Sequence, residues 1–266
     1  MPPEPSKPLV EPVQWSADGA PCSARFGDVY RSRSGALAQA QTVFLGGCQL
    51  PAAWQGRDGF TVLETGFGLG LNFLATWDAW ARDALRCRRL HYLAIEAYPV
   101  AAAELVRSAQ SCVAQGALPA DRCVHWMARA HALAAAWDKL VAGVQTVALA
   151  HGQVQLTLAV GDVLPMLARL LDAGSGVDAV YLDGFSPARN PRMWSVQTLA
   201  AVARLCRPDT SLATYTAAGA VRSALRQVGF AVRRRPGLPP KWHRLEARFV
   251  GRDAGDGAPA RDHMPA

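Results

Sequence analysis

The amino-acid sequence predicts an α/β protein built on a mostly parallel, Rossmann-like sheet of seven strands, the last two forming an antiparallel pair. Predicted strands and helices alternate along residues 61–228, which is typical of parallel strands covered by helices on both faces. One buried strand ends at Glu64 and runs into a turn with glycine at every second position. Another apolar run ends at Asp183. Because ligands of such sheets bind at the carboxyl ends of the strands, these acids mark a candidate site.

Each element follows from periodicity and from turn residues. Short apolar runs predict strands, and apolar residues three or four apart, such as Leu71, Leu74 and Trp77, predict helices. Strands are expected over residues 61–64, 90–96, 153–160, 177–182, 211–215, 231–235 and 245–250. Helices are expected over residues 37–44, 70–84, 100–109, 163–171, 196–205 and 218–228, after a small β-region at 26–30.

Three segments fall outside this alternation. Residues 1–24 are rich in proline and lack periodicity, so we expect an extended N-terminal arm. The domain itself is expected over 25–250, with residues 25–58 as an N-terminal extension. Residues 112–152 interrupt the rhythm and are expected to form a helical insertion beside the sheet. The tail 251–266, rich in Gly, Asp, Ala and Pro, is predicted to be disordered.

Composition narrows the class of protein. Half of the 266 residues are hydrophobic, which suffices for a sizeable core, and no run of about 20 apolar residues suggests a membrane span. The start has no signal-peptide pattern, and the six cysteines form no C-x-x-C, so we expect a cytoplasmic protein without zinc or disulfides. The net charge of +7 fits an anionic partner such as RNA and, equally well, a solvated basic surface.

The glycine turn distinguishes between two nucleotide cofactors. Gly66, Gly68 and Gly70 let the backbone approach a ligand closely because no Cβ intervenes. The dinucleotide fingerprint requires G-x-G-x-x-G, and here the third glycine comes one residue early. Glu64 would also repel a pyrophosphate, whereas it would attract an amino or sulfonium group. The turn therefore favours S-adenosylmethionine and methyl transfer over NAD chemistry.

Two further acids follow predicted strands. Glu96 ends the next strand, where an acid accepts both hydroxyls of a ribose. Asp162 is placed to accept the exocyclic amine of an adenine. Each has a structural alternative, since Glu96 suits a helix N-terminus and Asp162 suits the cap of a helix that starts at Val163. Their order at successive strand ends makes a cofactor site the more specific interpretation.

The segment from Asp183 to Trp194, DGFSPARNPRMW, carries the most specific signal. It resembles the methyltransferase part of the bacterial tRNA 5-methylaminomethyl-2-thiouridine synthesis enzymes, the MnmC/MnmD family. Further matching stretches lie at 26–30, 43–47, 66–73 and 213–222, so the resemblance covers roughly residues 25–250. It implies a class I S-adenosylmethionine-dependent methyltransferase. The implied reaction methylates the amine of 5-aminomethyl-2-thiouridine at the wobble position of tRNA.

The resemblance also implies roles for individual residues. Asp183 would accept a hydrogen bond from the amine and take its proton, or it would only cap its loop. Tyr30 would close over the cofactor or target base, or it would pack in the core. The implied cofactor-binding residues are Glu64, Gly66, Phe67, Gly68, Gly70, Asn72, Glu96, Asp162 and Asp183.

A second set of residues would meet the tRNA. Phe185 and Trp194 would stack on a flipped base, although at least one of them is expected in the core. Phosphate contacts, which give affinity without sequence choice, are expected from Arg189 and Arg192, with a solvated face as the alternative for any one arginine. Further candidates are Arg222, Arg226, Arg233, Arg234, Arg235, Lys241 and Arg244.

Two departures from the family pattern and two rival functions remain. Leu69 replaces a small hydroxyl residue in the glycine turn, and residues 237–244 lack the usual Gly-rich, basic form. Longer family members carry an FAD-dependent domain that generates the amine, and no room for it follows Val250, so a separate oxidoreductase or other supplier is expected. The rivals are a methyltransferase or aminopropyltransferase-like enzyme acting on a small amine, and a non-catalytic RNA-binding protein.

Overall fold

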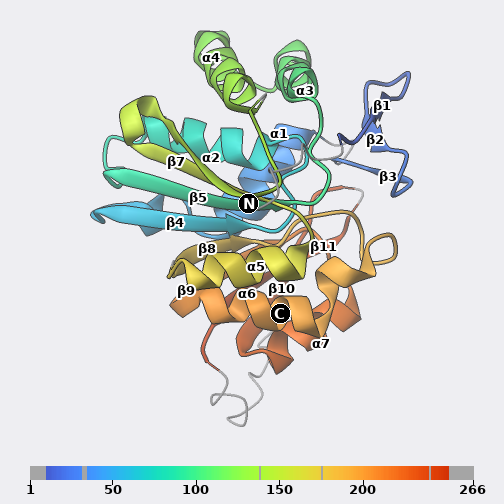
Figure 1. Ribbon diagram of the computed structural model, residues 1–266, viewed down its shortest axis with the longest axis vertical. Coiled ribbons are helices and arrows are strands. Elements are labelled where there is room, and N and C mark those ends of the chain that lie inside the picture. The colour runs from blue at the N-terminus through green and yellow to red at the C-terminus, as the bar shows by residue number, and fades with distance from the viewer. Residues whose placement is uncertain (1–9, 32–34, 138, 175, 240, 252–266) are drawn as a thin grey trace, which may run out of the picture.

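The computed structural model describes residues 10–31, 35–137, 139–174, 176–239 and 241–251. Its centre is an eight-stranded mixed sheet in the order β10-β11-β9-β8-β4-β5-β7-β6 (Figure 1). Strands β4, β5, β7, β8 and β9 are mutually parallel, and β11 and β6 run antiparallel to their neighbours. The strands are β4 (Gly59–Glu64), β5 (Arg89–Glu96), β6 (Gly143–Leu149), β7 (Val154–Val160), β8 (Val177–Tyr181), β9 (Cys206–Thr214), β10 (Phe230–Pro236) and β11 (His243–Phe249).

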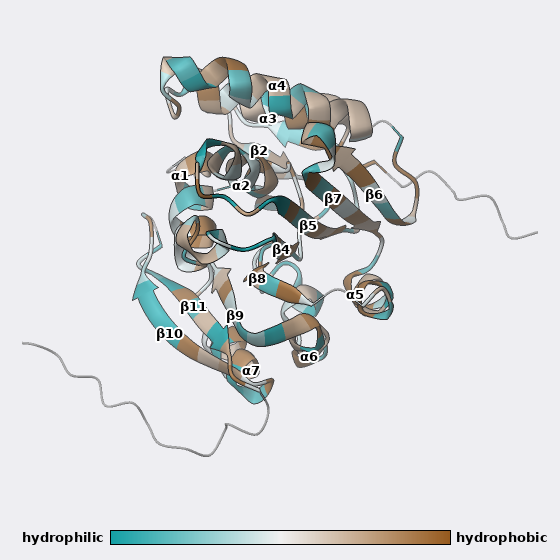
Figure 2. Ribbon diagram, turned by 90° about the vertical axis from the view of Figure 1, so that its left-hand side faces the viewer, coloured by the Kyte–Doolittle hydropathy of each residue, from teal (hydrophilic) through white to brown (hydrophobic). Residues whose placement is uncertain are grey.

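Helices cover both faces of this sheet, as the alternation predicts. One face carries α1 and α2, with α3 and α4 packed together beyond them, and the other carries α5, α6 and α7 (Figures 1 and 2). The short α1 continues directly into a π-helical turn at Ala40–Leu45. The helices are α1 (Ala36–Gln39), α2 (Leu71–Arg82), α3 (Ala102–Ala114), α4 (Ala120–Trp137), α5 (Val163–Asp172), α6 (Val196–Leu205) and α7 (Gly219–Gln227).

The strand register brings the predicted site residues to one edge of the sheet. All residues of β8 and nearly all of β4 are buried, which places these strands at the centre of the core. Glu64 pairs with Ala94 of β5 and with Tyr181 of β8. Because the three strands are parallel, Glu96 and Asp183 each lie two residues further along, at the same carboxyl edge.

The insertion at 112–152 is not wholly helical. Helix α4 lies within it, but residues Gly143–Leu149 form β6, an eighth strand that pairs with β7 at the edge of the sheet. Its residues alternate between half-buried and exposed, as expected for a strand with one face covered. The seven predicted strands are all present, and β6 adds to them.

The N-terminal region also differs from the expectation. Residues 10–24 are not an extended arm, since β1 (Val13–Trp15), β2 (Pro21–Ser23) and β3 (Asp28–Val29) form a three-stranded antiparallel sheet. Buried Glu11 organises it by accepting hydrogen bonds from Ser23 and Arg25, contacts that no sequence periodicity indicates. Residues 1–9 of the expected arm and 252–266 of the expected tail lie outside the described residues.

All six cysteines are free, three of them buried. Among the described residues, no helix has both the length and the apolar character needed to cross a membrane.

Candidate active site

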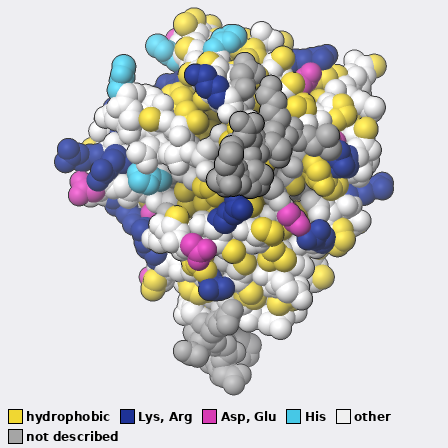
Figure 3. All heavy atoms as spheres, viewed as in Figure 1, with side chains coloured by type: hydrophobic (Ala, Val, Ile, Leu, Met, Phe, Trp, Pro, Cys, Tyr) yellow, Lys and Arg dark blue, Asp and Glu magenta, His cyan; other side chains and the backbone are white. Residues whose placement is uncertain are grey.

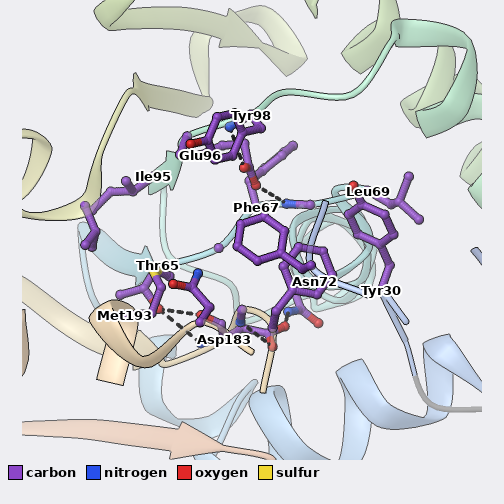
Figure 4. Close-up of a pocket in the computed structure, with 18 of the residues that line it drawn as sticks. Tyr30, Thr65, Phe67, Leu69, Asn72, Ile95, Glu96, Tyr98, Asp183 and Met193 are labelled. Atoms are coloured by element: carbon purple, nitrogen blue, oxygen red, sulfur yellow. Dashed lines mark hydrogen bonds between the residues drawn. The ribbon is translucent and has the colours of Figure 1, made fainter. Parts of the chain in front are cut away.

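A cavity of about 510 Å³ opens at the carboxyl ends of β4, β5 and β8, a size common for small-molecule sites. Its walls come from the glycine turn, from the segments after β5 and β8, and from the N-terminal sheet. Glu96 and Asp183 lie on opposite sides of it, with Phe67 between them and Tyr30 on a third side (Figure 4).

The glycine turn forms the floor of the cavity. Gly68 and Gly70 have positive φ values of 52° and 70°, a conformation that costs glycine little. Gly66 has a different reason to be glycine, because a Cβ there would lie 2.9 Å from the Cα of Gly184 and 3.1 Å from the carbonyl oxygen of Asp183. The turn therefore depends on glycine both for its path and for its close approach to the Asp183 loop.

Glu96 is fixed by the backbone of two loops. Its carboxylate accepts hydrogen bonds from the Gly68 N–H at 2.8 Å and from the Tyr98 N–H at 2.9 Å. Burial raises the pKa of Glu96, and the backbone hydrogen bonds oppose that rise. A carboxylate has about four acceptor positions, so acceptor capacity remains for hydroxyl groups in the cavity, as predicted for a ribose.

Glu64 lies behind the cavity wall and does not line it. It is buried, and its carboxylate accepts hydrogen bonds from Asn72 Nδ2 at 2.7 Å and from the Tyr92 hydroxyl at 2.9 Å. Burial, followed by the nearby Asp183, raises the pKa of Glu64 well above its ordinary value. The structure thus favours a role for Glu64 in positioning Asn72 over direct contact with a ligand.

Asp183 lines the cavity and is held from several sides. One carboxylate oxygen accepts from the Gly184 N–H and the other from Asn72 Nδ2, both at 2.8 Å. Its backbone N–H and carbonyl oxygen both bond to the Thr65 hydroxyl. Burial raises the pKa of Asp183 to about 6, against the effect of these hydrogen bonds. The loop-capping alternative therefore describes a real contact, yet the carboxylate still lines the cavity.

Thr65 is a site residue that the sequence analysis missed. Its hydroxyl lies within hydrogen-bonding distance of both backbone groups of Asp183 and so joins the ends of β4 and β8. A hydroxyl residue between the strand-end acid and the first glycine was the available signal.

Three aromatic rings close the cavity on the side of the N-terminal sheet. Phe185 stacks on Phe26 with ring centroids 4.5 Å apart and contacts Tyr30 edge-on at 5.0 Å. The Ser186 N–H donates to Asp28 at 2.9 Å, which ties the loop after β8 to β3. Burial, and then the charge of Glu96, raises the pKa of Tyr30, so its phenol is neutral. Tyr30 lines the cavity, and Phe185 is partly occupied by its aromatic neighbours.

Asp162 occupies the rim of the cavity. Its carboxylate caps α5 through the Val163 N–H, as the structural alternative predicts, and also pairs with Arg192 at 2.5 Å. Both side chains are largely exposed and line the cavity, so a role at an adenine remains compatible with this position.

The other predicted substrate residues lie outside the cavity wall. Trp194 is buried and donates its indole N–H to the Phe185 carbonyl oxygen, so Trp194 is a core residue that supports the loop. Arg189 is exposed. Lys241 reaches over the Tyr215 ring, with Nζ 3.5 Å from the centroid.

The donor set fits S-adenosylmethionine better than a pyrophosphate. Of the described lining residues, only Arg31 and Arg192 carry a positive charge. Arg31 is buried and donates to the Gly19 carbonyl oxygen, and Arg192 is paired with Asp162. The carboxylates of Glu96 and Asp183 instead favour hydroxyl groups and cations.

Comparison with known proteins gives the same class. A family described as S-adenosyl-L-methionine-dependent methyltransferase matches residues 125–249. The structure of MNMC2 from Aquifex aeolicus aligns over 90% of this chain and 70% of its own, with a TM-score of 0.67 and 19% identity, which shows a shared fold. The chain is a class I S-adenosylmethionine-dependent methyltransferase.

The sequence relatives narrow the family. The chain is 51% identical to the "tRNA 5-methylaminomethyl-2-thiouridine biosynthesis bifunctional protein MnmC" of Paracidovorax citrulli (strain AAC00-1), over 91% of this chain and 36% of that protein. It is 47% identical to the MnmC of Acidovorax sp. (strain JS42), over 92% of this chain and 36% of that protein. The chain belongs with the methyltransferase part of the MnmC family, as the Asp183 segment predicts, and it spans about a third of the length of these relatives.

Proposed function

We propose that this chain methylates the primary amine of 5-aminomethyl-2-thiouridine at the wobble position of tRNA, giving the 5-methylaminomethyl form. The observation that carries the proposal is Asp183, an acceptor with a pKa of about 6 that lines the cavity opposite Glu96. The names of the relatives supply the substrate class.

The cofactor, when bound, supplies an electrophilic methyl group on a sulfonium cation. The protein's task is then to align a neutral amine with that carbon. Glu96 would hold the ribose hydroxyls on one side of the cavity, and Asp183 would accept an N–H of the amine on the other. As the new C–N bond forms, the nitrogen loses a proton, and the Asp183 carboxylate is placed to take it.

The aromatic side of the cavity supports this arrangement. The neutral phenol of Tyr30 can donate a hydrogen bond without adding charge beside the cationic cofactor. Phe26 and Phe185, stacked next to it, exclude water from that side. The exposed Arg189 at the mouth favours a polyanionic substrate over a polyamine, which a cationic rim would repel.

We further propose that residues 25–250 are the methyltransferase domain, with the β1–β3 sheet as an added wall. The reaction is placed in the cytoplasm, where tRNA is modified. The aminomethyl precursor would come from an FAD-dependent oxidoreductase activity, in a separate protein or in a further part of a longer chain.

The test is methyl transfer from labelled S-adenosylmethionine to tRNA that carries 5-aminomethyl-2-thiouridine. The Asp183→Asn variant keeps the size and the hydrogen bond from Asn72 while removing the carboxylate. Incorporation by the wild type and its loss in the variant, with cofactor affinity retained, are the expected results. Cofactor binding without incorporation into this tRNA would exclude the proposed substrate and direct attention to small amines.

A further inference from the structure

The loop between β10 and β11 presents a tryptophan to solvent. Trp242 is 87% exposed, the highest value among the large hydrophobic side chains that the structure describes. The other seven tryptophans are buried or half-buried. Exposure of so large an apolar ring is costly unless a partner covers it.

The path of this loop is fixed. The Gly237 N–H donates to the Trp242 carbonyl oxygen at 2.9 Å, and the Lys241 N–H donates to that of Leu238 at 2.8 Å. A Cβ on Gly237 would lie 2.3 Å from the Lys241 carbonyl oxygen, so the loop closes only because that residue is glycine. Trp242 is therefore held at a defined place and its ordering cost is already met by the fold.

A chain of contacts connects the loop to the candidate active site. Lys241, next to Trp242, places Nζ 3.5 Å from the centre of the Tyr215 ring. The Tyr215 hydroxyl donates to the Gly184 carbonyl oxygen at 2.8 Å, and Gly184 follows Asp183. The exposed indole thus lies beside the mouth through which a nucleotide would reach Asp183.

The surroundings of Trp242 carry an excess of positive charge. Strand β10, at the edge of the sheet, is strongly hydrophilic (Figure 2) and exposes Arg233, Arg234 and Arg235. Glu246 is the one acid on the facing strand β11, and it pairs with both Arg235 and Arg244. Elsewhere on the surface, Lys and Arg are also more common than Asp and Glu on the face shown in Figure 3.

We propose that Trp242 is a stacking platform for an unpaired base of the substrate RNA next to the reacting uridine, with the β10 arginines contacting the phosphates on either side. An exposed aromatic ring flanked by cations is the arrangement that binds single-stranded nucleic acid. This inference rests on the proposed tRNA substrate and adds the surface that holds it.

The experiment measures binding of a fluorescently labelled, unmodified anticodon stem-loop RNA to the wild type, Trp242→Ala, Trp242→Phe and Val124→Ala. Val124 is a matched control because it is apolar and 74% exposed on α4. Trp242→Ala is expected to weaken binding roughly 5- to 150-fold, the range for losing one stacked base. Trp242→Phe should restore most of the affinity, and Val124→Ala should leave it unchanged.

A second RNA series separates stacking from a loss of charge or fold. Abasic sites are placed one at a time on either side of the reacting position. At the position that stacks, the abasic RNA should bind wild type and Trp242→Ala equally. Equal binding of Trp242→Ala and Val124→Ala to the intact RNA would overturn the proposal. So would a loss that persists undiminished with every abasic RNA.

This test is independent of the methylation reaction. RNA that binds through Trp242 but is not methylated by the wild type would leave the stacking surface standing and remove the proposed reaction. Methylation with the same KM in wild type and Trp242→Ala would have the opposite meaning.

Discussion

A single amide group, that of Asn72, lies between the carboxylates of Glu64 and Asp183. Its Nδ2 is 2.7 Å from Glu64 and 2.8 Å from Asp183. The two acids raise each other's proton affinity, and the pKa of Glu64 is raised well above that of Asp183, which is about 6. At neutral pH the proton of this pair therefore stays on buried Glu64, and the charge lies on Asp183, where it faces the cavity.

The first prediction concerns pH. Methyl transfer should fall as the pH drops through about 6, because protonated Asp183 cannot accept the amine proton. Binding of the cationic cofactor favours the ionised carboxylate, so the midpoint seen in kcat should lie below that seen in kcat/KM. The measurement is a pH–rate profile at saturating and at low cofactor. An identical profile in Asp183→Asn would contradict the assignment.

The same shift predicts the stability of Asp183→Asn. The folded state raises the pKa of Asp183 from 3.8 to about 6, so it binds this proton more tightly than the unfolded chain does. The contribution of Asp183 to stability is thus fully present at low pH and is lost as the pH rises through about 6. Replacement by neutral Asn should raise the unfolding free energy near pH 8 by about 1–3 kcal/mol. Denaturant unfolding near pH 5 and near pH 8 checks whether the gain is confined to the higher pH.

The second prediction isolates the link itself. Asn72→Ala removes the donor shared by Glu64 and Asp183, which should raise the pKa of both acids and cost about 1–3 kcal/mol for the carboxylate left unpaired. The pH–rate midpoint should move upward together with a lower maximal rate. Asn72→Asp should be more severe, because a third acid replaces the donor. A reduced rate with an unmoved midpoint would mean that Asn72 acts only through packing.

The predictability of the fold depends on how each residue is buried. Strands such as β8, buried throughout, are continuous apolar runs and are easily recognised. Edge strand β6 was missed because its alternating burial gives a short, weak pattern beside the long helix α4. The β1–β3 sheet was missed because it depends on Glu11, Ser23 and Arg25 meeting in space.

The same contrast holds in the candidate site. The sequence locates Glu96 and Asp183, because strand ends can be read from apolar runs. It could not show that Glu64 faces away from the cavity, since that depends on the Tyr92 hydroxyl from the neighbouring strand. Nor could it distinguish the buried Trp194 from the exposed Trp242, two tryptophans in similarly polar segments.

The third prediction concerns Gly66. A methyl group there would lie 2.9 Å from the Gly184 Cα, closer than side-chain carbons come to backbone atoms in folded proteins. Gly66→Ala should therefore displace the loop that carries Asp183 and reduce methyl transfer by at least about tenfold, which corresponds to 1.4 kcal/mol. Cofactor affinity should fall as well.

Gly219→Ala is the control for this substitution. A Cβ on Gly219 meets no atom within 4 Å, and the residue begins α7, where alanine is the better helix former. It should keep full activity and unfold at the same or a slightly higher temperature. Comparable activity in the two alanine variants would show that the Asp183 loop tolerates the displacement.

The fourth prediction separates the stability of the fold from the chemistry of the site. Asp178, near the start of β8 and far from the cavity edge, has a side chain only 5% exposed. It accepts hydrogen bonds from the Thr61 N–H at 2.8 Å, from Arg57 at 2.7 Å and from Arg207 at 2.8 Å. Asp178→Ala leaves the Thr61 N–H and two guanidinium groups without their acceptor, and breaking such a buried pair costs about 3–5 kcal/mol.

Asp58→Ala is the matched control, since Asp58 also faces an arginine, Arg88 at 4.0 Å, but both side chains are 85% exposed. An exposed pair of this kind contributes little because water screens it, so Asp58→Ala should unfold at nearly the wild-type denaturant concentration. Under conditions where both variants are folded, each should bind S-adenosylmethionine with wild-type affinity. A weakened cofactor affinity in folded Asp178→Ala would mean that the amino-terminal edge of β8 is coupled to Asp183 at its other end, and the separation of fold from site argued above would then fail.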